Sequence, residues 1–411
     1  MSCSTFSRQT LAACSGSDAM NATIYLDHNA TTQPAAEVVA AMADTLLHCW
    51  GNVSSAHSMG GEAKGRLVKA RAQVAALLGA SPAEIVFTSG ATESNHMAIL
   101  GALTAQPGKT HIVSSTVEHP ATLKLLEHLA ALGFAITYLA VDEQGRLDPA
   151  QIEAALTPQT AVLSLMWANN ETGALFPIAA AAQMAKAKGV WFHTDAVQAV
   201  GKVDVDMRQI PVDLLSVSAH KLHGPPGVGA LFVRKGVVLP PLMFGHQERR
   251  RRGGTENLPG IVGFGEAAQQ LGQSWRADAV HVRTLRDLFE QQLRQKFPAV
   301  RINADAALRL PNTSNFAFGN AFGPIFGPID SEIILDRLDK AGVCASSGSA
   351  CTAGGTEPSH VLIAMGQPPE TALSALRFSF GSGNTAAEIH QVIGLLQGIV
   401  EPLLHEMAAT A

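Results

Sequence analysis

Short apolar runs alternate with helical patterns between about residue 84 and residue 233. Such alternation predicts strands that helical crossovers join into a mostly parallel β-sheet. Ligands bind sheets of this kind beyond the carboxyl ends of the strands, so polar residues that directly follow an apolar run are candidates for a site. The runs are Ile85 to Phe87, His111 to Val113, Ala135 to Leu139, Ala161 to Met166, Val190 to Phe192 and Leu214 to Val217.

Helix ends can be located between these runs. Asp148 followed by Pro149 is an N-cap with proline at the first helical position. Gly133 and Gly189 stand where helices should stop, because glycine readily adopts the left-handed conformation of a helix end. We therefore predict an α/β domain for this part of the chain.

The pattern changes after residue 263. A long charged helix, roughly Glu266 to Lys296, precedes short strands and two more helices, which is typical of a smaller α+β domain. We expect a large domain over residues 32–275 and a small domain over residues 21–31 and 276–411, with the boundary near residues 265–280. Residues 1–20 are predicted to be a disordered tail. The Gly/Pro/Phe-rich segment 319–329 is predicted to be a loop.

Composition narrows the classes of function. The net charge is -5, and the only dense basic run, Arg249 to Arg252, is too short for a nucleic-acid-binding surface. No apolar run approaches the ~20 residues that span a bilayer, so we expect a cytoplasmic protein without a membrane partner. The five cysteines are odd in number and none forms a CxxC pair, which argues against a disulfide framework or a structural zinc site.

Two segments have the chemistry to bind a phosphorylated aromatic cofactor. Thr88 to Asn95 follows an apolar run and opens a helix, so its N–H groups and hydroxyls could surround a phosphate, although an ordinary helix cap explains it equally well. Asp195 ends a later run, where burial is costly without a cation such as a protonated pyridine nitrogen. A helix-capping aspartate is the alternative.

Two candidate nucleophiles follow. Lys221 comes after an apolar strand and before a Gly/Pro turn, with Ser218 and His220 beside it. Burial and nearby cations would favour a Schiff base between this amine and an aldehyde cofactor, although most lysines are solvated surface residues. Cys351 lies among small, flexible residues, which is typical of an accessible and reactive thiol. Cys344, in an apolar setting, fits a packed cysteine better.

These segments, in this order and spacing, resemble the cysteine desulfurases of the NifS and IscS type, within the class V aminotransferase-like enzymes that use pyridoxal 5'-phosphate (PLP). The likeness covers about residues 23 to 400 and leans toward the group I, NifS side. It implies the PLP-dependent transferase fold type I, whose large domain has a mostly parallel, seven-stranded sheet. The most specific elements are Leu26 to Thr32, Ser218 to Lys221, Arg252 to Asn257 and Ser346 to Thr352.

The resemblance implies roles for individual residues. Lys221 would carry PLP, Asp195 would pair with the pyridine nitrogen, and His119 would stack on the ring and act as acid or base toward the substrate thiol. Cys351 would take the substrate sulfur as a persulfide. Arg377 would bind the substrate carboxylate, a task suited to its bidentate fork. The other implied contacts are Asn170 and Gln198 at the phenolic oxygen, Asn170 at the substrate, and Ala91, Thr92, Ser218 and His220 at the phosphate.

The resemblance also implies partners. The residue that matches Thr255 reaches the phosphate of the partner subunit, so a homodimer is expected. The implied reaction converts L-cysteine to L-alanine and passes sulfur to an acceptor protein such as an iron-sulfur scaffold. Cys351 could ligate a cluster transiently with that scaffold, whereas no resident metal is expected. The identity of the acceptor, and a role in nitrogen fixation or in housekeeping, stay open.

Other functions are compatible with parts of this pattern. A selenocysteine lyase or a cysteine sulfinate desulfinase would use the same cofactor, but neither needs the thiol of Cys351. An aminotransferase of this fold would have no use for the cysteine-bearing loop. The non-enzyme alternative is a catalytically silent PLP-fold partner protein. Departures from the family pattern are the glycine-poor stretch Phe244 to Gln247 and the long segment 319–329.

Overall fold

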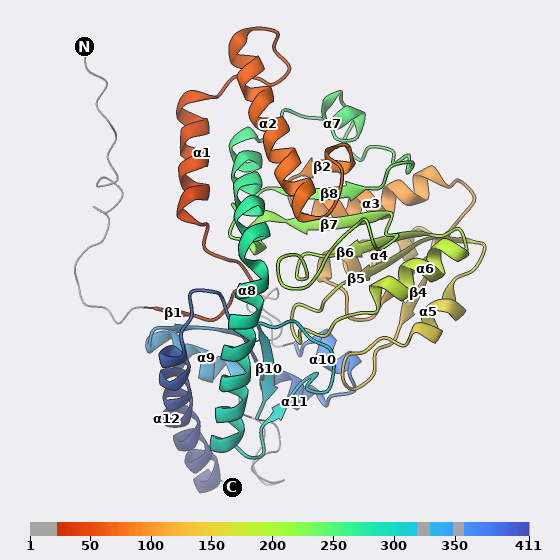
Figure 1. Ribbon diagram of the computed structural model, residues 1–411. Helices are drawn as coiled ribbons and strands as arrows, with labels where there is room; N and C mark the ends of the chain where they lie inside the picture. Colours follow the sequence, from red (N-terminus) through yellow and green to blue (C-terminus); the bar gives the residue numbers. More distant parts are fainter. Residues whose placement is uncertain (1–22, 319–328, 348–356, 411) are drawn as a thin grey trace, which may run out of the picture.

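The computed structural model describes residues 23–318, 329–347 and 357–410 (Figure 1). Cys351, the expected tail at residues 1–20 and nearly all of the segment 319–329 lie outside these residues, so the predictions for them stay predictions. In the described part of the chain, no helix is both long enough and apolar enough to cross a membrane.

A seven-stranded sheet forms the centre of the larger part of the molecule. Its strand order is β2-β8-β7-β6-β5-β3-β4, and every neighbouring pair is parallel except the two pairs that β8 makes. The predicted α/β fold with a mostly parallel sheet is therefore confirmed. The strands are β2 (Ile85–Thr88), β3 (His111–Ser115), β4 (Ala135–Leu139), β5 (Thr160–Met166), β6 (Trp191–Asp195), β7 (Leu214–Ser218) and β8 (Gly229–Val233).

The central strands have continuous apolar runs because helices cover both faces of the sheet. Leu214 and Leu215 are adjacent in β7, yet they belong to different apolar clusters on opposite sides of the strand. The helices of this region are α1 (Ala36–His48), α2 (Ser58–Leu77), α3 (Ala91–Ala105), α4 (Pro120–Ala131), α5 (Pro149–Ala155), α6 (Ile178–Ala187) and α7 (Gln247–Arg250), with 3₁₀ turns at Pro82–Glu84 and Ala219–Lys221.

The predicted helix ends are confirmed. The Asp148 carboxylate accepts a hydrogen bond from the N–H of Ala150 at 2.9 Å and so caps α5. Gly133 and Gly189 follow α4 and α6 with positive φ angles of 94° and 64°. Local sequence is sufficient at these positions, because a cap needs only the residues beside it.

The smaller part of the molecule contains two further sheets. The segment β1 (Ile24–Tyr25) pairs in parallel with β11 (Val343–Cys344). A second sheet has the order β12-β13-β10-β9, built from β9 (Arg301–Ile302), β10 (Thr313–Ala317), β12 (Ser346–Ser347) and β13 (Ala375–Ser379). Among the described residues, α9 (Ser331–Lys340) and α12 (Ala386–Thr410) pack with these sheets, whereas α10 (His360–Ala364) and α11 (Pro369–Leu373) contribute to the core of the large sheet.

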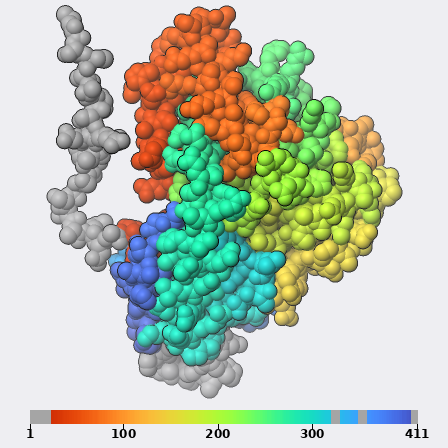
Figure 2. Space-filling view, in the orientation of Figure 1, coloured from red at the N-terminus to blue at the C-terminus, as the bar shows by residue number. Residues whose placement is uncertain are grey.

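The helix α8 (Leu258–Lys296) connects the two parts (Figures 1 and 2). It begins eight residues before the predicted start, where the Asn257 side chain caps it by accepting from the N–H of Gly260 at 3.2 Å. Glycines in its first turns obscured the helical pattern. They allow close packing, since a Cβ at Gly265 would lie 2.6 Å from the Cα of Ala70 on α2.

The two ends of α8 belong to different hydrophobic cores. Ile261 and Phe264 pack in the core of the large sheet, whereas Leu285 and Phe289 pack in a second core with β1, β10, β13 and α12. The expected domains, 32–275 and 21–31 with 276–411, stay a prediction, since Val361 and Leu362 of the second set also pack in the core of the large sheet. The proposed boundary at residues 265–280 would then lie within one continuous helix.

Candidate functional site

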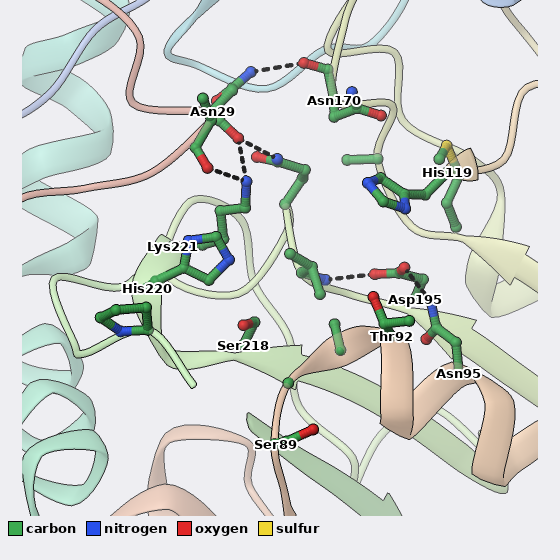
Figure 3. A pocket seen from close by; sticks show the side chains of 18 of the residues that line it. Asn29, Ser89, Thr92, Asn95, His119, Asn170, Asp195, Ser218, His220 and Lys221 are labelled. Carbon is green, nitrogen blue, oxygen red and sulfur yellow. Dashed lines mark hydrogen bonds between the residues drawn. The ribbon is translucent and has the colours of Figure 1, made fainter. Parts of the chain in front are cut away.

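A cavity of about 490 Å³ opens at the carboxyl ends of the strands of the large sheet (Figure 3). Loops that follow β2, β3, β5, β6 and β7 line it, together with residues of the small region. The structure thus brings together residues that are far apart in sequence. The lining residues are Asn29, Ala30, Ser89, Gly90, Ala91, Thr92, Asn95, His119, Met166, Ala168, Asn170, Asp195, Val197, Gln198, Ser218, His220, Lys221, Pro226, Gly227 and Arg377.

The Lys221 amine projects into this cavity from the 3₁₀ turn that follows β7. Its Nζ donates hydrogen bonds to the carbonyl oxygens of Asn29 at 2.6 Å and Ala30 at 2.5 Å (Figure 3). Beside it, burial followed by the charge of Lys221 lowers the pKa of His220 to about 4. Since His220 is then neutral near pH 7, it can accept or donate a hydrogen bond without adding positive charge.

Asp195 lies across the cavity at the end of β6. Its Oδ2 accepts from the Asn95 side chain at 2.7 Å, and its Oδ1 accepts from the N–H of Val197 at 3.0 Å (Figure 3). The carboxylate therefore caps the turn after β6 and also faces the cavity. Capping a turn and facing a ligand are therefore compatible roles for Asp195.

His119 is the N-cap of α4. Its Nδ1 accepts from the N–H of Ala121 at 3.1 Å, so the neutral ring carries its proton on Nε2. Burial lowers the pKa of His119, Asp195 opposes that shift, and Lys221 and His360 reinforce it. A neutral imidazole with a fixed tautomer can stack on an aromatic ring and exchange a proton through Nε2.

The helix α3 begins at the cavity without a side-chain cap at Gly90. The Glu93 carboxylate is engaged elsewhere, since it accepts from the N–H of Ser89 and forms an ion pair with Arg252 at 2.9 Å. The helix N-terminus around Ala91 and Thr92 therefore faces the cavity. Its dipole and N–H groups favour an anion there.

Arg377 reaches the cavity from the middle of β13. Its side chain is 2% exposed and forms an ion pair with Asp27 at 2.7 Å, and its Nη1 donates to the carbonyl oxygen of Asn170 at 3.3 Å. Its Nε has no hydrogen-bond partner among the described residues. This guanidinium retains a donor for a further acceptor, such as a carboxylate.

Two predicted residues lie apart from this group. Thr255 does not line the main cavity but lines a neighbouring one of about 150 Å³, which shares Ser89 and Gly227 with it. Cys351 lies outside the described residues, so the structure gives no position for it. Within the described ranges, no group of three or more His, Cys, Asp or Glu side chains is arranged to hold a metal.

Sequence reasoning missed Asn29 and Asn95. Asn29 accepts from Lys221 and also from the Gln198 side chain at 2.9 Å, both at its carbonyl oxygen. Its own amide donates to the Asn170 carbonyl at 3.1 Å. Asn29 acts here through its backbone carbonyl, which every residue type has, whereas the side chain of Asn95 binds Asp195, a residue 100 positions away.

This chain is similar to known proteins over most of its length. The aminotransferase class-V profile matches residues 24–392. A cysteine desulfurase of Trichormus azollae is 48% identical, covering 92% of this chain and 93% of that protein. A cysteine desulfurase of Gluconacetobacter diazotrophicus is 49% identical, covering 93% of this chain and 94% of that protein. A solved NifS-like protein has a TM-score of 0.84 at 34% identity, covering 92% of this chain and 99% of that one.

The chain belongs to the aminotransferase class-V family. Within that family it is an enzyme of the cysteine desulfurase type, as its motifs predicted. Enzymes of this family depend on PLP. The assignment as a silent partner protein loses its support.

Proposed function

We propose that this protein removes sulfur from L-cysteine, releases L-alanine and holds the sulfur as a persulfide on Cys351 for delivery to an acceptor protein. The observation that carries the proposal is the convergence of Lys221, Asp195, His119 and Arg377 on one cavity. These four side chains come from separate elements, and each has chemistry that the reaction requires.

The cavity fits PLP by the chemistry of its donors and acceptors. Lys221 would hold the aldehyde carbon, Asp195 would face the pyridine nitrogen, and the start of α3 with Ser218 and His220 would hold the phosphate. Asn170 and Gln198 would lie at the phenolic oxygen. When bound, PLP supplies an electron sink that stabilises negative charge at the substrate Cα.

The protein residues then have distinct tasks. Arg377 binds the substrate carboxylate, while the Lys221 amine accepts the Cα proton and later returns one. His119, whose neutral ring carries its proton on Nε2, can donate that proton toward the substrate sulfur. The Cys351 thiolate attacks the substrate sulfur, so that an S–S bond forms, the C–S bond breaks and its electron pair passes to the carbon skeleton, which is protonated and released as alanine.

We also propose a partner subunit and an acceptor protein. The cavity at Thr255 adjoins the main cavity through Ser89 and Gly227, which supports a homodimer in which Thr255 serves the neighbouring active site. A cytoplasmic iron-sulfur scaffold is the proposed acceptor, and Cys351 would share a cluster with it transiently. A role in iron-sulfur cluster assembly follows from that choice.

The test measures alanine and sulfide released from L-cysteine in the presence of dithiothreitol, together with the PLP absorbance, for the wild type and for Cys351→Ser. We expect the wild type to turn over and the variant to keep its absorbance while losing sulfide release. If the variant is equally active, Cys351 is not the sulfur acceptor. The same assay with selenocysteine and cysteine sulfinate would then measure the lyase and desulfinase alternatives directly.

A further inference from the structure

A second lysine lies next to the site. Lys202, in the turn after β6, shares a small cavity of about 60 Å³ with Lys221. Its Nζ donates to the Oε1 of Gln198 at 2.9 Å. Neither the motifs nor the reaction described above gives Lys202 a task, yet it contacts a residue proposed to bind the cofactor.

The contacts of Gln198 fix which end of its amide faces which neighbour. Lys202, which can only donate, occupies the amide oxygen, and the Asn29 carbonyl, which can only accept, is bound by the amide nitrogen at 2.9 Å. Rotating the amide by half a turn would set nitrogen against the ammonium group and oxygen against the carbonyl oxygen. Both contacts would then be lost, so one orientation is selected.

The charge around Lys202 is unusual. Among the described residues, no carboxylate forms an ion pair with Lys202, and the charged groups that act on it are Lys221 and Arg377. Burial, followed by these two cations, lowers the pKa of Lys202 to about 7. His28 and His223 line the same cavity, as does Asp278 of α8. Burying an ammonium group without a carboxylate partner costs free energy of folding. This cost points to a functional task for Lys202.

We propose that Lys202 is a positioning residue that holds the Gln198 amide with its nitrogen toward the site, so that this end of the cavity offers a hydrogen-bond donor to the phenolic oxygen of the cofactor. The inference rests on the proposed function, because it needs PLP in the cavity. Gln198 is 5% exposed, so its amide has few other partners to choose from.

The test compares Lys202→Met, which has a similar length but no donor, with Lys202→Arg, which keeps charge and donors. The dissociation constant of PLP is measured by titrating each apo protein, and the pH midpoint of the bound PLP absorbance is measured for each holoenzyme. We expect Lys202→Met to weaken PLP binding about tenfold, the effect of one hydrogen bond to a charged group. Its midpoint should rise, because a donor and a cation that favour the deprotonated form are lost. Lys202→Arg should restore both values.

A double-mutant cycle separates positioning from a general structural role. In a Gln198→Ala background, Lys202→Met should weaken PLP binding less than twofold further, because the residue acts through Gln198. The matched control is Lys186→Met on α6, an exposed lysine whose loss should change neither value. If Lys202→Met does not fold, Lys202→Ala takes its place, since water can occupy the vacated space.

The outcomes are distinguishable. If the wild type binds no PLP, the proposed function fails. If the wild type binds PLP and the Lys202 variants bind it equally, or if the two substitutions add independently, the inference about Lys202 fails and the proposed function stands.

Discussion

The seven-stranded sheet and the four-stranded sheet supply the same cavity in different ways. The large sheet contributes side chains at the ends of its strands or just beyond them, such as Asp195 and Lys221, which neighbouring amide groups and carbonyls hold. The small sheet contributes Arg377 from the middle of β13, where the guanidinium is 2% exposed and forms an ion pair with Asp27. A buried guanidinium needs a fixed carboxylate, whereas a residue beyond a strand end can use the backbone.

One segment joins the two contributions. Asn29 donates from its side chain to Thr313 on β10 and to the carbonyl of Asn170 in the large region. Its carbonyl accepts from Lys221, and its N–H donates to the side chain of Ser379 on β13. The site therefore depends on contacts between the two regions as well as on each sheet.

The largest expected effect concerns the large-sheet side. Lys221→Ala removes both the attachment point of the cofactor and the base, so sulfide release should fall by at least about three orders of magnitude. Reduction with borohydride followed by peptide mass spectrometry should label Lys221 in the wild type and no lysine of the variant. Comparable activity in the variant would remove Lys221 from its proposed role.

The next effect concerns the support of the large sheet. Glu248 forms a buried bidentate ion pair with Arg71, both contacts being 2.6 Å, and accepts from the N–H of Phe87 on β2. Glu248→Ala leaves Arg71 buried without its partner and should lower the free energy of unfolding in urea by about 3–5 kcal/mol. The double variant Arg71→Met with Glu248→Leu should recover much of that loss. Equal stability of wild type and Glu248→Ala would contradict this account.

A smaller effect tests the small sheet. Arg377→Lys keeps the charge but loses the planar fork, so the KM for L-cysteine should rise about 10- to 100-fold, while PLP absorbance is retained. Arg283→Lys, an exposed position on α8, is the matched control and should not change KM. A fall in kcat with unchanged KM would show that Arg377 does not bind the substrate in its ground state.

The last effect depends on pH and tests a carboxyl group beside the link between the two regions. Burial raises the pKa of Glu171 to about 7, partly offset by the hydrogen bond from Ser359 and the charge of Arg377. The folded protein therefore holds this proton to higher pH than the unfolded chain does. The stability that this provides is complete below about pH 4.5 and is lost as pH rises toward 7.

Glu171→Gln cannot titrate, so over that pH range it should gain about 3 kcal/mol in free energy of unfolding relative to the wild type. Urea denaturation at several pH values measures the difference, and Glu127→Gln at an exposed position should show no such trend. A constant difference between Glu171→Gln and wild type across this range would contradict the raised pKa.

Local signals account for what the sequence predicted well. Six of the strands and the cap at Asp148 follow from short runs of contiguous residues. The family follows from several short motifs, each of which is also contiguous. The strand β8 was not singled out in advance, although it completes the sheet. The start of α8 was placed too late, because glycines that serve close packing weaken a helical pattern.

The sequence by itself therefore determined six strands of the large sheet, several helix ends and the residue types that the chemistry requires. Only the tertiary structure decided that the Asn29 carbonyl holds both Lys221 and Gln198, that Asp27 is the partner of Arg377, and that Lys202 donates to Gln198. These contacts join residues up to 350 positions apart. Backbone acceptors are independent of residue type, and an ion pair between distant residues depends on how the two regions pack, so neither can be predicted from a local pattern.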